Sequence, residues 1–317
     1  MVEHAALPVS AERARLTRSA ALASIAMAVL LVTLKSWATW KTGSTAMLGS
    51  LADSALDLVA SLATLVGVWI AARPADEDHR FGHGKAEALA AIVQVMLISI
   101  SAFGIAVRAV GQLTGGGETT AAAEGIGVSL IAILATLVLV WWQRHVISRT
   151  GSIAIRTDNL HYQSDLLLNL AVIAALAIDQ YLGFSTADPL FGLGIAAWLA
   201  WGAFNAASEA VDHLMDKEWS EERREEFLAV LAHHPELRGV HDLRTRTSGA
   251  IDFVQFHAAI DGSTPLREVH RIMDELEARI EADFPGVEVL IHPDPEGLIN
   301  EEGVAAEELL PERKGPA

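Results

Sequence analysis

Two pairs of polar side chains stand inside apolar stretches of this sequence. Asp53 and Asp57 are four residues apart in "SLADSALDLVAS", and so are His161 and Asp165 in "HYQSD". On a helix, this spacing puts both members of a pair on one face. An ionised side chain at the centre of a bilayer costs at least ~2.5–3.5 kcal/mol. If the pairs face each other, they form a tetrahedral site of three carboxylates and one imidazole, which suits a divalent transition-metal ion.

Two simpler explanations stay open for these residues. They could be unrelated polar residues near helix ends, or acids that burial keeps neutral by raising their pKa values. The matched spacing of the two pairs favours the metal site. Because the chain contains no cysteine, disulfides, thiolate metal sites and cysteine nucleophiles are excluded, and any metal must use N or O ligands.

Further histidines stand outside the apolar stretches. In the loop "ARPADEDHRFGHGKAEALA", Asp76, His79 and His83 have spacings that allow ion binding, but a solvated loop with incidental histidines explains them equally well. In the C-terminal part, His241, His257, His270 and the pair His292 and Asp294 fall on different predicted elements, and the residues alone favour scattered surface histidines. A surface position is also expected for five more histidines: His4, His145, His213, His233 and His234.

The apolar stretches are the elements that must position the first two pairs. Six runs with almost no charge are long enough, or nearly so with their flanks, to cross ~30 Å of hydrocarbon as helices. They are Thr17–Leu34, Ala46–Ala72, Ala88–Val107, Gly125–Trp142, Leu166–Ile178 and Pro189–Ala207. We therefore predict a polytopic helical membrane protein with six transmembrane helices. No signal peptide is expected, because residues 1–18 are polar and charged.

Charge sets the expected orientation and separates the two halves of the chain. Nine Lys or Arg residues flank the runs on the side of the N-terminus, against at most three on the other side, so both termini are predicted to be cytoplasmic in a plasma (inner) membrane protein. From Glu209 onward there are 26 acidic and 11 basic residues, a net charge of −15, whereas the first 208 residues carry −2. An acidic C-terminal part argues against nucleic acid binding and is compatible with cations.

The C-terminal part has the pattern of a soluble α+β domain. "SEERREEFLAVLAHH" and "TPLREVHRIMDELEARIEADF" predict helices, "VHDLRTRTSGAIDFVQFHAAI" predicts two strands around a turn at Ser248–Gly249, and "VEVLIH" predicts a last strand. The order αββαβ indicates helices packed on a sheet. We expect a cytoplasmic tail at 1–15, a membrane domain at 16–208, a cytoplasmic domain at 209–297 and a disordered tail at 298–317.

From about Leu16 to Pro295 the chain resembles the cation diffusion facilitator family, most closely its bacterial ferrous-iron and zinc efflux branch. The stretches that carry the resemblance are "SLADSALDLVAS", "PADEDHRFGHGKAEALAA", "LHYQSD" and "HDLRTRTSG". The resemblance implies six transmembrane helices, a metallochaperone-like cytoplasmic domain and a homodimer. It also implies export of divalent metal, driven by inward proton movement.

The resemblance assigns roles to individual residues. Asp53, Asp57, His161 and Asp165 match the family's transport site, and Asp76, His79 and His83 match its loop site. The family's cytoplasmic site is matched by His241, His257, His270, His292 and Asp294. In that site two ions are shared near the dimer interface, and Asp294 bridges them. The resemblance therefore replaces the surface prediction for these histidines. Lys85 and Asp216 match a charge pair between protomers, and Leu160 matches an apolar gate. Pro293 departs from relatives that use a ligand at this position, because proline offers only its carbonyl.

The expected mechanism is alternating access. Metal enters from the cytoplasm, and the helices rock so that the site opens outward. Protons then compete with the metal for the imidazole and the carboxylates. An imidazole has a reference pKa of ~6.5, so it titrates near physiological pH. Zn²⁺ is the preferred substrate and regulatory ion, and Fe²⁺, Cd²⁺, Co²⁺ and Mn²⁺ are also compatible with the ligand set.

Three other function classes compete with transport. A membrane metal sensor or scaffold that moves no ions would need only the C-terminal sites, and the intramembrane quartet argues against it. A passive channel is disfavoured because a dry four-ligand site binds too tightly for fast conduction. An enzyme is the least favoured class, because a closed four-ligand site leaves no position for an activated water.

Overall fold

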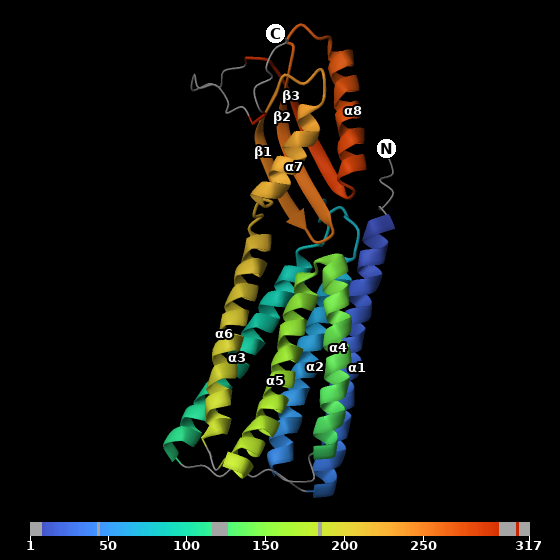
Figure 1. Ribbon diagram of the computed structural model, residues 1–317. Coiled ribbons are helices and arrows are strands. Elements are labelled where there is room, and N and C mark those ends of the chain that lie inside the picture. The colour runs from blue at the N-terminus through green and yellow to red at the C-terminus, as the bar shows by residue number, and fades with distance from the viewer. Residues whose placement is uncertain (1–7, 43–44, 116–125, 183–185, 298–308, 311–317) are drawn as a thin grey trace. The chain divides into compact units, whose positions relative to one another are not determined.

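The computed structural model describes residues 8–42, 45–115, 126–182, 186–297 and 309–310. Six long helices come first in the chain (Figure 1). They are α1 (Pro8–Thr42), α2 (Thr45–Ala71), α3 (Ala86–Gly115), α4 (Ile126–Thr150), α5 (Ile153–Leu182) and α6 (Ala187–Leu214). The chain divides into two compact units, Ala11–Val211 and a second unit of Met1–Ser10 with Asp212–Ala317. We call the first the helical unit and the second the α+β unit.

Four segments of the helical unit are long and apolar enough to cross a membrane. They are Ala11–Lys41, Leu51–Ala71, Ala86–Thr114 and Ala187–Leu214. Neither α4 nor α5 reaches this threshold over the residues that the structure describes. In α5 the apolar run is interrupted by the polar residues of "RTDNLHYQSD". The helical membrane fold is confirmed, and the count of six spans stays a prediction.

Helix α5 is the centre of the helical unit. It packs against α2, α3 and α4, and α2 also packs along α3. The α2–α3 contact depends on small residues, because a Cβ atom added at Gly67 would lie 2.4 Å from Ala90 Cβ and 3.0 Å from the Ala86 carbonyl oxygen. Small residues let helix backbones approach closely in membranes. Helix α5 is therefore held by its neighbours on several sides.

The turn between α4 and α5 sets where α5 begins. Gly151 has a φ of +61°, a left-handed conformation that glycine adopts at little cost. Ser152 is buried, and its hydroxyl donates to Glu87 Oε2 at 2.6 Å. Arg13 on α1 pairs with the same glutamate at 3.0 Å. This ion pair ties the start of α5 to α1 and α3.

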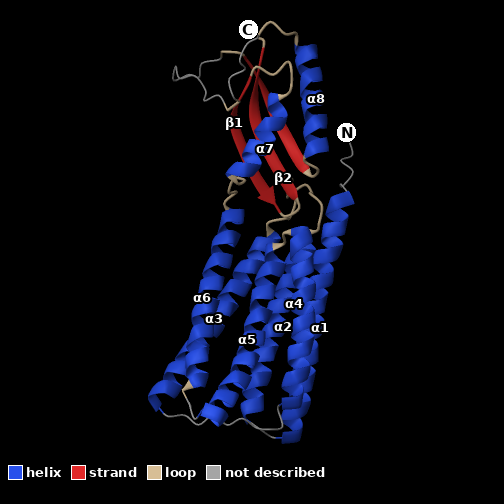
Figure 2. Cartoon of the chain, viewed as in Figure 1, coloured by secondary structure: helices blue, strands red, loops and turns tan. Residues whose placement is uncertain are grey.

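The α+β unit contains α7 (Glu221–Ala232), β1 (Gly239–Ser248), β2 (Ile251–Ile260), α8 (Leu266–Asp283) and β3 (Val287–Pro295). The predicted order αββαβ is confirmed. The strands form one sheet in the order β1-β2-β3, with β1 antiparallel and β3 parallel to β2 (Figure 2). The Ser248–Gly249 turn is also observed, with Gly249 at a φ of +63°.

One apolar core holds the two helices of this unit on the sheet. Ile272, Met273, Leu276 and Ile280 recur at helical spacing on α8 and are all buried. The sequence predicts an apolar face of Leu266, Val269, Met273, Leu276 and Ile280; its last three members are buried, whereas Leu266 is exposed at the start of the helix. They share the core with buried residues of α7 and of the strands. Within the expected disordered tail, residues 298–308 and 311–317 lie outside the described part. The two described residues, Leu309 and Leu310, pack against this core, and the Leu309 N–H donates to the Val240 carbonyl at 2.8 Å.

The close approach of α2 and α3 predicts that Gly67→Ala destabilises the helical unit. The added methyl group overlaps Ala90 and the α3 backbone, and overpacking of this kind costs about 1–3 kcal/mol. A matched control is Gly104→Ala on α3, because a Cβ atom at Gly104 has no neighbour within 4 Å. Thermal unfolding in detergent should show a lower midpoint for Gly67→Ala alone. Equal midpoints for the two variants would contradict the packing argument.

Candidate metal sites

Asp57, His161 and Asp165 converge in the helical unit, and we call them the membrane trio. His161 Nε2 lies 2.9 Å from Asp57 Oδ1 and 3.8 Å from Asp165 Oδ2. Each residue offers a ligand atom within 4.8 Å of the other two. His161 is buried and the two acids are half-buried. Three of the four residues in the two predicted pairs thus meet from α2 and α5, with N and O atoms that suit a divalent transition metal.

Asp53 is the one predicted transport-site residue that does not join the trio. It lies on α2 one turn before Asp57 and is exposed. Next to it, Ser54 is buried and accepts a hydrogen bond from Lys35 Nζ of α1 at 2.7 Å. Three of the four predicted ligands therefore lie together, and the role of Asp53 as a fourth ligand stays a prediction.

A second acid on α5 was missed at the sequence level. Asp158 is fully buried and accepts hydrogen bonds from Ser24, Gln94 and Gln143, which lie on three other helices. A signal was available, because positions 158, 161 and 165 fall on one helical face. The four-residue spacing of His161 and Asp165 indicates metal ligands, whereas Asp158 falls outside that spacing.

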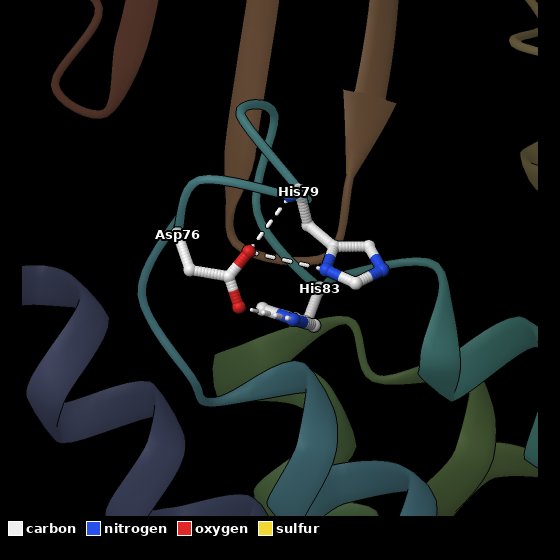
Figure 3. A group of neighbouring side chains, drawn as sticks. All are labelled: Asp76, His79 and His83. Carbon is white, nitrogen blue, oxygen red and sulfur yellow. Dashed lines mark hydrogen bonds and ion pairs between the residues drawn. The ribbon is translucent and has the colours of Figure 1, made fainter.

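The loop site forms around one carboxylate. Asp76 Oδ1 lies 3.1 Å from His79 Nδ1, and Asp76 Oδ2 lies 3.3 Å from His83 Nε2 (Figure 3). The His83 ring is held from its other side, where Nδ1 lies 3.2 Å from the Pro74 carbonyl oxygen. Gly82 follows the turn with a φ of +75°, which lets the loop bring His83 back to Asp76. The residues of this loop are arranged as a ligand group.

The Asp76 carboxylate is also bound by the backbone. The His79 N–H donates to Asp76 Oδ1 at 2.7 Å. This hydrogen bond is the main reason why the pKa of Asp76 lies below its ordinary value, with a smaller contribution from the His79 side chain. A carboxyl group with a lowered pKa stays ionised as the pH falls. Asp76 therefore keeps its metal-binding form to lower pH than an ordinary aspartate.

The tail histidines gather because of strand register. His241 on β1 pairs with His257 on β2, which in turn pairs with His292 on β3. Asp294 is buried beside this row, with Oδ2 at 3.2 Å from His241 and 2.8 Å from His257, and Oδ1 at 3.2 Å from His292. We call these four residues the sheet cluster. The interpretation as scattered surface histidines is wrong for them, because three adjacent strands align them in one row.

His270 stays apart from the sheet cluster within one chain. It is exposed on α8, with Nδ1 at 3.4 Å from Asp274. A hollow of about 550 Å³ lies beside it, lined by Leu266, Arg267, Val269, Met273 and Pro293. Pro293 is in register with Ala258 of β2.

A fourth group contains His234, Glu236 and Glu275. His234 was expected at the surface, but this is wrong, because it is buried where α7 ends. Arg271 donates to Glu236 at 2.9 Å and to Glu275 at 2.5 Å. Since this arginine already supplies the positive charge between the two acids, we assign no ion to the group.

Three further predicted residues can be located. Asp216 has a φ of +56° and lies 3.6 Å from Arg246 within the α+β unit; Lys85 precedes α3 in the helical unit. The pairing of Lys85 with Asp216 between protomers stays a prediction. Leu160 of α5 packs against α6. A Cβ atom added at Gly202 of α6 would lie 2.9 Å from both Cδ atoms of Leu160.

Comparison with known proteins covers both units. Residues 21–215 match the cation efflux transmembrane domain, and residues 219–296 match the cytoplasmic domain of cation efflux proteins. The cation-efflux pump FieF of Yersinia enterocolitica is 43% identical over 296 residues, which is 93% of this chain and 98% of that relative. FieF of Klebsiella pneumoniae is 43% identical over 285 residues, with 90% and 95% covered. A solved zinc form of CzrB aligns with 26% of this chain and 94% of its own, at 40% identity and a TM-score of 0.25.

The shared position of Asp294 predicts that Asp294→Asn weakens metal binding to the α+β unit. The amide keeps the shape but loses the charge that faces three imidazoles. We expect at least ~10-fold weaker binding at this cluster, since even outer-shell changes cost 10–100-fold. Titration calorimetry of the full chain with Zn²⁺ measures this, with Asp283→Asn at the exposed end of α8 as the control. Unchanged zinc stoichiometry and affinity would remove Asp294 from the ligand set.

Proposed function

Because the chain belongs to the cation efflux (cation diffusion facilitator) family, we propose that it exports a divalent transition-metal ion from the cytoplasm in exchange for protons. The transport site consists of Asp53, Asp57, His161 and Asp165, and it works by alternating access. The observation that carries this proposal is the membrane trio: two carboxylates and an imidazole meet from α2 and α5 inside the helical unit. A protein that only sensed metal would have no need of ligands there.

Proton coupling follows from the chemistry of these ligands. Metal binding requires a neutral imidazole and ionised carboxylates, so metal and protons compete for the same atoms. His161 Nε2 lies 2.9 Å from Asp57 Oδ1, so the two groups can share a proton. An ion that arrives from the cytoplasm displaces that proton, and protons from outside displace the ion. His161 is the first candidate for the exchanged proton.

Zinc is the proposed substrate. Carboxylate and imidazole ligands accept Zn²⁺, Fe²⁺, Cd²⁺, Co²⁺ and Mn²⁺ to different degrees, and the Irving–Williams order favours zinc over iron and manganese. Metal availability in the cell also decides which ion is carried. We place the protein in the plasma (inner) membrane as a multi-pass homodimer, with both termini in the cytoplasm.

We assign a regulatory role to the sheet cluster. The part of the chain from Glu209 onward carries a net charge of −15, so two such domains repel each other, and bound metal offsets that repulsion. His270 is outside the cluster in a single chain, as expected of a ligand given to a neighbouring protomer.

With Asp294→Asn, the domains should no longer become more compact when metal is added, as measured by X-ray scattering; unchanged compaction would remove this role.

The central prediction is that Asp57→Ala abolishes transport. The substitution removes the carboxylate nearest to His161, and uptake of Zn²⁺ into inside-out vesicles should fall to the level of empty vesicles. Asp188→Asn, in the first turn of α6 and outside the trio, should transport normally. The experiment is done in proteoliposomes with internal pH recorded at the same time.

The outcomes of this assay separate the function classes. Wild-type zinc flux with opposite proton flux supports antiport. Zinc flux without proton movement indicates a channel, and binding without flux indicates a sensor. Normal zinc flux by a folded Asp57→Ala variant would refute the proposed site.

The contact between Leu160 and α6 gives a further prediction, for the proposed gate. In Gly202→Ala the new methyl group displaces the Leu160 side chain, which directly precedes His161. We expect slower zinc transport, by ~10-fold, at unchanged zinc affinity of the detergent-solubilised protein; a steric clash of about 1–3 kcal/mol corresponds to this range. Gly194→Ala on the same helix meets nothing within 4 Å and is the control. Equal rates for both variants would exclude a gate at this contact.

A further inference from the structure

Asp158 is a fully buried carboxylate that the proposed transport site does not use. Its Oδ1 accepts a hydrogen bond from Gln94 Nε2 at 2.8 Å. Its Oδ2 accepts one from Ser24 Oγ at 2.5 Å and one from Gln143 Nε2 at 2.7 Å. Three donors around one carboxylate stabilise the ionised form.

The partners of Asp158 are all neutral. Among the residues that the structure describes, no Lys, Arg or His forms an ion pair with it, whereas Asp57 and Asp165 both have an imidazole within 4 Å. An anion without a counter-ion is costly in a membrane domain. Its charge therefore depends on other charges nearby, and it can change when one of them arrives or leaves.

The charges that can act on Asp158 belong to the membrane trio. The titratable groups that can act on it through their charge are Asp57 on α2 and His161 on its own helix, and Tyr162 also faces it. The adjoining helices α1, α3 and α4 contribute the neutral Ser24, Gln94 and Gln143. Asp158 comes one helical turn before His161, so a divalent ion at the trio would act on it directly through the electric field.

The surrounding network can accommodate both charge states of Asp158. Gln94 Nε2 also donates to Thr64 Oγ1 on α2, while Gln94 Oε1 is buried and has no hydrogen-bond partner among the described residues. If the amide rotates by 180°, Oε1 takes the place of Nε2. It can then accept hydrogen bonds from a protonated Asp158 and from the Thr64 hydroxyl. The ionised and neutral forms of Asp158 would each have partners.

We propose that Asp158 is a proton-binding site of the export cycle, separate from the metal ligands. This inference rests on the proposed antiport. When a divalent ion binds to the trio, its positive charge favours the carboxylate, and the Asp158 O–H releases its proton to solvent. When the ion leaves, Asp158 takes up a proton again. Because metal and proton binding are linked reciprocally, this acid adds to the number of protons exchanged for each ion.

The test is Asp158→Asn, which removes the ionisable group and keeps its size. Protons released when Zn²⁺ binds to the full chain in detergent are measured by calorimetry in buffers of different ionisation enthalpy. We expect zinc still to bind to the trio, with up to one proton fewer released per chain. In proteoliposomes, the proton-to-zinc ratio should fall correspondingly. In an Asp57→Ala background, where the trio holds no zinc, adding Asp158→Asn should change nothing further.

A milder variant covers the case in which Asp158→Asn does not fold. Ser24→Ala removes one of the two donors to Oδ2, so the ionised form is less favoured. The pH at which the linked proton is released should move upward by roughly half to one unit, which is the effect of about one hydrogen bond. The control is Ser19→Ala on the same helix, which should leave the profile in place, because the Ser19 hydroxyl donates to the Leu16 carbonyl of its own helix.

Each result decides one question. If wild-type protein moves zinc with no proton movement, the proposed antiport fails. If wild type exchanges protons and Asp158→Asn exchanges as many, the inference about Asp158 is overturned. A change in stability without a change in the proton count means that Asp158 is only structural. A Ser24→Ala profile that coincides with wild type also overturns the inference.

Discussion

The contact between Asp57 and His161 is the interaction on which the helical unit depends. Either group alone is costly in apolar surroundings, but at 2.9 Å each supplies the other's partner. The contact requires α2 and α5 to lie side by side at a fixed rotation. The glycine contact between α2 and α3, and the packing of α3 and α4 on α5, supply that constraint. The small residues where the helices cross are therefore needed to bring Asp57 and His161 within contact distance.

Features that depend on the spacing of residues along one segment could be predicted from the sequence. Features that depend on how strands pair with one another could not. The four-residue spacing of His161 and Asp165, the order αββαβ and the amphipathic face of α8 are local, and all appear in the structure. The row of His241, His257 and His292 comes from pairing between strands far apart in the chain. No periodicity along one segment contains that information, so the residues alone suggested scattered histidines; only the family resemblance indicated a site.

Asp158 shows a different limit of sequence reasoning. Its position on the face of His161 was visible, but its partners Ser24, Gln94 and Gln143 are ordinary polar residues on three other helices. Nothing in their types predicts that they meet. The helical unit thus holds acids in two ways: the half-buried Asp57 and Asp165 face an imidazole, and the buried Asp158 faces neutral donors. In our proposal, the first arrangement exchanges a cation for a proton, and the charge of Asp158 changes with the charge held by the first.

The three ligand groups differ in composition as their surroundings differ. The loop site has two histidines and one aspartate in an exposed loop, and the sheet cluster has three histidines around one buried aspartate, whereas the membrane trio has two aspartates and one histidine. Near water, neutral imidazoles hold an ion without having to balance its charge. In a low-dielectric interior the ligands must balance a double positive charge, so carboxylates have to predominate. In the proposed export cycle the same carboxylates would take up protons when the ion leaves, so a ligand set that balances the charge of the ion would also couple metal to protons.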